Sequence, residues 1–239
     1  MDIIRPRLTD YHGIHKNQAD LDFAIQFFDE DIPLYVDPFL LWKSPSQQDN
    51  ALYTTITNSF NHLNYLIKKK QEDEALSILI DISECHEVGL GVSKTRKGTK
   101  ISEKQAQDIL SLFKDIPEYS QFGFTHFEII QLYISGISKD RISDITCNYL
   151  KSFLIDYTIE QCEINKIPTE GVILDSIYNY KTNKLDTNQK VYLPVNPLTK
   201  EPLIFTPKRW LRFNTWINYE DYFQKYCPRD EIFNPDEPE

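Results

Sequence analysis

Apolar side chains recur along the first two thirds of the chain with the spacing of amphipathic helices. The clearest case covers 51–70, where four apolar residues repeat at i, i+4, i+7 and i+11: Ile56, Phe60, Leu63 and Ile67. This spacing places them on one face of a helix. Acidic residues open the segment 72–82 and favour a second helix there, because acidic side chains stabilise helix N-termini.

Two capping-box patterns predict further helices. Ser102 followed three residues later by Gln105 predicts a helix over 103–114. Thr125 and Glu128 repeat the pattern and predict another helix. The region 1–168 is therefore expected to be mainly helical.

The longest predicted helix covers 144–165. Gly136 is placed to end the helix before it, and Ser143 or Asp144 would be its N-cap. Pro168 marks its end.

The first predicted strand and helix pair lies in DIPLYVDPFLLW (31–42). IPLYV reads as a short buried strand, and Asp37 would cap the helix that follows, with Pro38 at its first position.

After Pro168 the pattern changes to short runs rich in β-branched and aromatic residues. GVILDSIYNY (171–180), KVYLPV (190–195) and PLIFTP (202–207) predict three strands of a small antiparallel sheet. KRWLRF (208–213) and a segment around 219–226 are expected to be helical. The predicted class is α+β, with a helical region 1–168 and a strand-rich region 169–239 in one continuous domain.

Composition, cysteine usage and the lack of a targeting signal together predict a soluble globular protein of the cytoplasm. Of its 239 residues, 41% are hydrophobic and 26% are charged, which is typical of folded domains. No apolar run approaches the roughly 18–20 residues that span a bilayer, so no membrane partner is expected. The N-terminus has no signal-peptide pattern, and four widely spaced cysteines predict free thiols in a reducing compartment: Cys85, Cys147, Cys162 and Cys227.

The net charge of −10 argues against a protein that coats nucleic acid. One basic segment, which we call the basic island, interrupts this acidic background over 94–104. It contains one acidic residue and five basic residues: Lys94, Arg96, Lys97, Lys100 and Lys104. Because a local field depends on its neighbours, this island could still hold a phosphate group.

Three of the seven glycines stand in or beside this island, in HEVGLGVSKTRKGTKIS (86–102). Backbone amides in tight turns form anion-binding nests, which gives six candidate ligand-binding residues: Gly89, Gly91, Ser93, Lys94, Arg96 and Lys97. The stretch matches neither the P-loop nor the dinucleotide-binding pattern. The alternative interpretation is an ordinary solvated loop.

The second candidate site is acidic. Asp140 and Asp144 flank Arg141 at an expected interhelical corner, where they could hold a divalent cation or orient a water molecule as catalytic residues. Asp156 and Glu160 repeat at i, i+4 further along and would complete a metal-binding set. The alternatives are a helix-capping network for the first pair and a solvated helix face for the second. A divalent cation is the one cofactor that these residues suggest.

Four segments together resemble a known group of proteins: DIPLYVDPFLLW, EVGLGVSK, DRISDIT and YTIEQC. The group consists of uncharacterised bacterial proteins associated with phage-defence or mobile-element neighbourhoods. The resemblance spans 31–165 and implies one continuous unit, and it transfers no catalytic residue.

Three functions fit these features. The favoured one is a cytoplasmic binding or interaction subunit, of an anti-phage defence or regulatory complex, with a protein partner or a second copy and a basic loop that contacts phosphate or nucleic acid. The second is a metal-dependent nuclease-type hydrolase that uses the acidic set. The third is a nucleotide sensor that wraps phosphates with the 89–98 loop.

Overall fold

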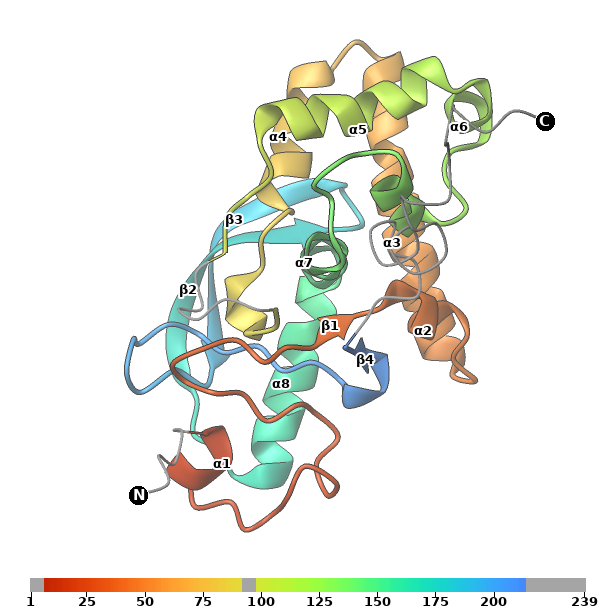
Figure 1. Ribbon diagram of the computed structural model, residues 1–239. Coiled ribbons are helices and arrows are strands. Elements are labelled where there is room, and N and C mark those ends of the chain that lie inside the picture. Colours follow the sequence, from red (N-terminus) through yellow and green to blue (C-terminus); the bar gives the residue numbers. More distant parts are fainter. Residues whose placement is uncertain (1–6, 92–97, 214–239) are drawn as a thin grey trace, which may run out of the picture.

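The computed structural model describes residues 7–91 and 98–213 (Figure 1). The α-helices are α1 (Leu8–Tyr11), α2 (Pro38–Trp42), α3 (Gln47–Lys68), α4 (Glu72–Asp81), α5 (Glu103–Asp115), α6 (Pro117–Phe122), α7 (Lys139–Tyr149) and α8 (Lys151–Asn165). The 3₁₀ helices are η1 (His86–Val88), η2 (Phe127–Leu132) and η3 (Lys208–Trp210). The strands are β1 (Tyr35–Val36), β2 (Glu170–Asn179), β3 (Lys184–Leu193) and β4 (Leu211–Arg212). Strands β1 and β4 pair antiparallel, as do β2 and β3. The predicted α+β class is confirmed.

Two predicted helix starts are confirmed by their caps. The Asp37 carboxylate accepts a hydrogen bond from the Phe39 amide at the start of α2, and Pro38 occupies the first position. At the start of α5, the Ser102 hydroxyl accepts from the Gln105 amide, and the Gln105 side chain accepts from the Ser102 amide. Both caps satisfy amides that have no partner within the helix.

Replacing Ser102 by alanine is expected to lower the free energy of unfolding by about 1 kcal/mol, because the first turn of α5 loses its capping acceptor. Urea unfolding followed by circular dichroism measures this loss. Serine 120 of α6 is half-buried and caps no helix, so Ser120→Ala is the control and is expected to change stability by less than about 0.5 kcal/mol. An equal loss in both variants would contradict the capping role.

The helices predicted from apolar spacing over 51–70 and 72–82 form as α3 and α4. α3 begins earlier than predicted, at Gln47, because the Ser46 hydroxyl accepts from the Asp49 amide and caps the helix there. Its apolar face is buried as the spacing requires.

The prediction of one helix over 144–165 is wrong. The chain forms α7 and α8, and Leu150 separates them with backbone angles of φ −97° and ψ 7°. Ser138 precedes α7 at its N-cap, so Asp144 lies in the middle of a helix and caps nothing. Its carboxylate is instead engaged by the Cys85 amide and by Arg141.

The helix predicted from Thr125 and Glu128 is also wrong. This segment forms the 3₁₀ helix η2, and His126 is its N-cap residue without a side-chain capping bond. Glu128 is buried and accepts hydrogen bonds from the Tyr53 hydroxyl, so a tertiary contact replaces the capping box.

The C-terminal region contains two of the three predicted strands, β2 and β3. The third run, PLIFTP, forms no strand and makes two isolated bridges, from Pro202 to Val195 and from Pro207 to Phe23. Its backbone amides bond elsewhere: Ile204 N–H donates to the Glu87 carbonyl, and Phe205 N–H donates to the Thr158 hydroxyl.

Two other predictions need correction at the sheet formed by β1 and β4. The segment KRWLRF was predicted to be an α-helix, but it forms the 3₁₀ helix η3 followed directly by the strand β4, which pairs with β1. The predicted strand IPLYV is correspondingly reduced to Tyr35–Val36. The helix predicted around 219–226 lies outside the described residues.

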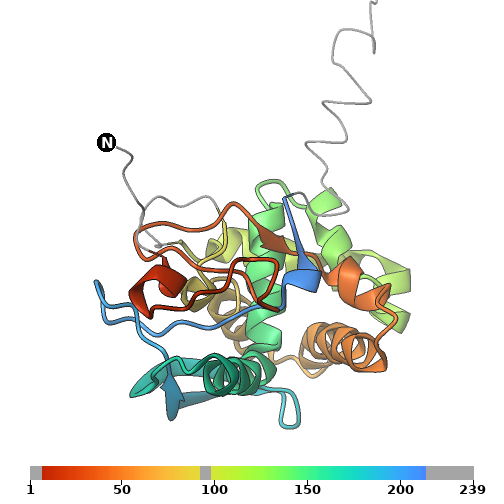
Figure 2. The ribbon, with the colours of Figure 1, turned by 90° about the horizontal axis from the view of Figure 1, so that it is seen from below.

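The hydrophobic core joins the helical and strand-rich parts of the chain. Its main cluster combines Phe60 of α3 and Ile145 of α7 with Tyr178 and Leu193 of the β2–β3 hairpin and with Trp210. Figure 2 shows α8 running beside this hairpin. None of the helices in the described ranges is both long and apolar enough to cross a bilayer.

Candidate functional site

The glycine stretch is described at its two ends only. Ser93, Lys94, Arg96 and Lys97 lie outside the described residues. Gly89 has φ +58° and Gly91 has φ +125°, so both adopt conformations that favour glycine. Their amides are already used, because Gly89 N–H donates to the His86 carbonyl and Gly91 N–H to the Ile32 carbonyl.

Carboxylates surround both described ends of the stretch. A Cβ placed on Gly91 would lie 2.6 Å from Asp140 Oδ1 and 3.7 Å from Asp31 Oδ2, and one placed on Gly98 would collide with the Glu84 carboxylate. Negative charges at such short range oppose the binding of a phosphate. Gly89 and Gly91 therefore offer a phosphate no free amide, and the carboxylates beside Gly91 and Gly98 give an unfavourable field.

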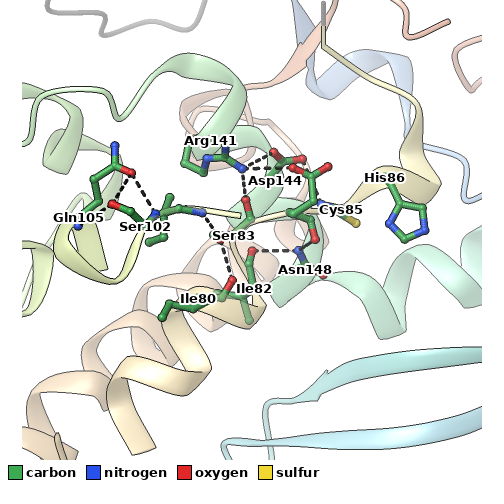
Figure 3. A network of polar contacts seen from close by, with 12 residues as sticks. Ile80, Ile82, Ser83, Cys85, His86, Ser102, Gln105, Arg141, Asp144 and Asn148 are labelled. Carbon is green, nitrogen blue, oxygen red and sulfur yellow. Dashed lines mark hydrogen bonds and ion pairs between the residues drawn. The ribbon is translucent and has the colours of Figure 1, made fainter. Parts of the chain in front are cut away.

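Asp144 is fixed by a polar network that connects the chain before the glycine stretch to α7 (Figure 3). The Cys85 amide donates to Asp144 Oδ1 at 3.3 Å. Arg141 donates to the Ser83 carbonyl, to Glu84 Oε2 at 3.2 Å and to Asp144 Oδ2 at 3.4 Å. One guanidinium thus holds a backbone carbonyl and two carboxylates.

Asn148 and Ser83 extend this network in both directions. The Asn148 side-chain amide donates to the carbonyls of Ile82 and Glu84, each at 2.8 Å. The Ser83 hydroxyl donates to the Ile80 carbonyl and accepts from the Ile101 amide. The network therefore connects the chain before the glycine stretch, and the end of the stretch at Ile101, to α7.

The carboxylates in this network are hard to ionise. Burial raises the pKa of Asp144 well above its usual value, and the nearby charges of Glu84 and Asp140 raise it further, against the pull of Arg141. Burial also raises the pKa of Glu84 and of Asp140. These shifts follow from desolvation and like-charge repulsion.

The four predicted metal-binding residues do not form one group. Asp140 and Asp144 lie one turn apart on α7, whereas Asp156 and Glu160 are exposed on α8. Within residues 7–91 and 98–213, no group of three or more His, Cys, Asp or Glu side chains has the geometry to hold a metal ion. The Asp144 carboxylate instead pairs with Arg141, which also pairs with Glu84.

Two buried ionic clusters were not predicted from the sequence. Lys151 Nζ lies 3.0 Å from Glu87 Oε1, and both side chains are almost completely buried. The Tyr53 hydroxyl lies 2.7 Å from His126 Nδ1 and 3.2 Å from each Glu128 oxygen. Burial raises the pKa of Glu128. Lys151 lies 64 residues from Glu87, and Tyr53 lies 73 residues from His126, so no local pattern marks these contacts.

The cysteines show no sign of activation. Cys85, Cys147 and Cys162 are buried free thiols, which confirms the prediction for three of the four, and Cys227 lies outside the described residues. Burial raises the pKa of the Cys85 thiol well above its usual value. A reactive cysteine requires the opposite shift.

An exposed, mainly aromatic surface lies on α6 and at the end of η2, and we call it the α6 face. It consists of Tyr119, Phe122, Leu132 and Tyr133. Phe122 is 74% exposed, Tyr133 is 50% exposed and Leu132 is 42% exposed. Tyr119 joins them, because it lies one turn before Phe122 and its hydroxyl lies 2.9 Å from that of Tyr133.

A groove adjoins the α6 face. It has a volume of about 450 Å³ and lies between α5 and the segment after η2. Lys104 and Asp108 of α5 line one side, and Tyr133 and Ile134 line the other. Apolar side chains with charged neighbours of both signs are typical of protein-binding surfaces.

Comparison with known proteins places the chain in a family without assigning an activity. No curated protein and no solved structure matches it significantly. A family model described as a domain of unknown function, DUF8370, matches residues 13–218. Because this match covers most of the 239 residues, the chain belongs to the DUF8370 family.

Proposed function

We propose that the chain is a protein-binding subunit and that the α6 face with its adjoining groove is its binding surface. The observation that carries the proposal is the exposure of Phe122 and Tyr133, which Tyr119 links because it lies one turn before Phe122 and contacts the Tyr133 hydroxyl. Contiguous exposed apolar side chains of this kind mark interaction sites in soluble proteins.

A protein fits this surface better than a nucleic acid does. Of the five residues in the basic island, the structure describes Lys100 and Lys104. Lys100 Nζ is paired with Asp81 at 2.6 Å, and Asp108 lies with Lys104 in the groove. Nucleic-acid surfaces require an excess of positive charge, whereas a mixed rim around an apolar centre is usual between proteins.

The partner that we propose is a second copy of the chain. In a two-fold dimer the same patch contacts itself, so each charged residue meets the patch of the other copy. Because the groove is lined by both Lys104 and Asp108, Lys104 of one copy can form an ion pair with Asp108 of the other copy. The net charge of −10 on each copy opposes association at long range, so salt should strengthen the dimer by screening that repulsion.

Light scattering over a concentration series tests the proposal. We expect a monomer–dimer equilibrium whose association constant rises with salt. Phe122→Glu should weaken association roughly thirtyfold, which corresponds to about 2 kcal/mol for a central interface residue. Because Phe122 is exposed, the substitution should leave the fold intact.

Phe213→Glu is the matched control. Phe213 is 68% exposed, nearly as much as Phe122, but it follows β4 and lies outside the α6 face. The control should associate as the unmodified chain does. A monomer at every concentration and salt, or equal weakening by the two substitutions, would contradict the proposal.

The structure supports the other functions predicted from the sequence less than it supports a protein-binding subunit. Asp144 is held by the Cys85 amide and Arg141, and the described residues contain no metal-binding group of His, Cys, Asp or Glu, so the hydrolase has less support. The nucleotide sensor depends on residues 92–97, which the structure does not describe. The role in a defence or regulatory complex stays a prediction, and self-association is compatible with it.

A further inference from the structure

A second hollow in the molecule lies away from the α6 face. It has a volume of about 260 Å³ and is lined by residues of α3, of the end of α7, of α8 and of the turn between β2 and β3. Figure 2 shows this turn (cyan) reaching past α8 toward α3. The volume lies just below the usual range for ligand pockets, so a small ligand would fill it.

The lining combines aromatic rings with a single charge. Tyr149, Phe153 and Tyr180 contribute rings, and Leu52 adds apolar surface. Asp156 is the one charged side chain among the lining residues of this hollow. Asp156 was a predicted metal ligand, but the structure places it beside aromatic rings and away from Asp144.

The Asp156 carboxylate is available to a ligand. Among the residues that the structure describes, it has neither a salt bridge nor a side-chain hydrogen bond. Aromatic faces attract organic cations through their electron-rich π systems. A carboxylate beside such rings adds a charge-assisted hydrogen bond for an ammonium group.

We propose that this hollow binds a small organic cation, with the ammonium group on Asp156 and the apolar part against Phe153, Tyr180 and Leu52. An inorganic metal ion does not fit this lining, because a single carboxylate cannot supply the several oxygen ligands that a hard cation requires. A neutral apolar molecule would leave the charge of Asp156 unused. The proposal is independent of the α6 face.

Isothermal titration calorimetry with phenethylammonium chloride tests this site, with 2-phenylethanol as the neutral analogue of the same shape. We expect saturable binding of one phenethylammonium per chain, weakened by added salt. The alcohol should bind at least about tenfold more weakly, because it lacks the charge that meets Asp156.

Asp156→Asn and Glu160→Gln form a matched pair of variants. Both residues are exposed acids one turn apart on α8, but only Asp156 lines the hollow. Asp156→Asn should raise the dissociation constant of phenethylammonium at least about tenfold, and Glu160→Gln should leave it within about twofold. Thermal unfolding of each variant verifies that both fold.

Three results would overturn the proposal. They are no saturable binding up to about 10 mM, equal affinity for the ammonium and the alcohol, or equal loss of affinity in the two variants. Phe122→Glu should bind phenethylammonium like the unmodified chain, so failure of the dimer and failure of this site can be distinguished.

Discussion

Replacing Arg141 by methionine is expected to lower the free energy of unfolding by about 3–5 kcal/mol at pH 7, because two carboxylates lose their buried counter-charge. The side chains of Arg141, Glu84 and Asp144 are each at most 15% exposed. The same substitution removes the bond to the Ser83 carbonyl. Urea unfolding measures the loss.

The loss should depend on pH in a defined direction. Burial raises the pKa values of Asp144, Glu84 and Asp140 in the folded state. Groups with raised folded pKa values favour folding when protonated, and this contribution disappears as pH rises through those values. Without Arg141 the carboxylates are harder still to ionise, so the deficit of Arg141→Met should be smaller at pH 5 than at pH 7.

Lys114→Met is the control for this prediction. Lys114 Nζ lies 2.6 Å from Glu72 Oε2, but both side chains are roughly half exposed. Exposed ion pairs contribute little, so the control should lose less than about 1 kcal/mol. A small loss for Arg141→Met that is independent of pH would contradict the structural role of the network.

Replacing Lys151 by methionine is expected to cost a similar amount, about 3–5 kcal/mol, because it leaves the Glu87 carboxylate buried without its partner. Burial alone would raise the pKa of Glu87, but attraction by Lys151, by His86 and by hydrogen bonds lowers it below the usual value. A carboxyl group with a lowered folded pKa stabilises the fold above its unfolded pKa. That stabilisation is lost as pH falls through the folded value.

The double variant Glu87→Leu with Lys151→Met distinguishes the energy of the Glu87–Lys151 interaction from the contribution of each side chain alone. Replacing both partners by apolar residues removes the unpaired charge, so the double variant should be more stable than Lys151→Met alone. A double-mutant cycle from urea unfolding gives the coupling energy. Additive losses would show that the two side chains do not stabilise each other.

Local signals explain which elements the sequence predicts correctly. The apolar spacing of α3 and the capping box of α5 depend on residues within one or two turns, and the structure contains both. The break at Leu150 has no such signal, since no glycine or proline marks it. Lys151 begins α8 and pairs with Glu87, which lies 64 residues earlier. This long-range contact cannot be inferred from local pattern.

In the candidate site, too, local contacts could be predicted from the sequence and long-range contacts could not. The sequence identified Asp140, Arg141 and Asp144 as a group, and the structure places all three on α7. It did not identify Ser83 and Glu84 as the partners of Arg141, because these contacts join chain segments more than fifty residues apart. The sequence also did not predict that Phe122 is exposed, since an aromatic residue in a short helix usually packs inward.

Cross-linking through position 122 tests the proposed dimer most directly. In a two-fold contact centred on the α6 face, Phe122 of each copy lies near its counterpart. Phe122→Cys should therefore form a disulfide-linked dimer under mild oxidation, and Phe213→Cys should not, although both positions are exposed. A chain that stays monomeric with cysteine at 122, or that cross-links equally at 213, would contradict the proposal that the α6 face binds a second copy.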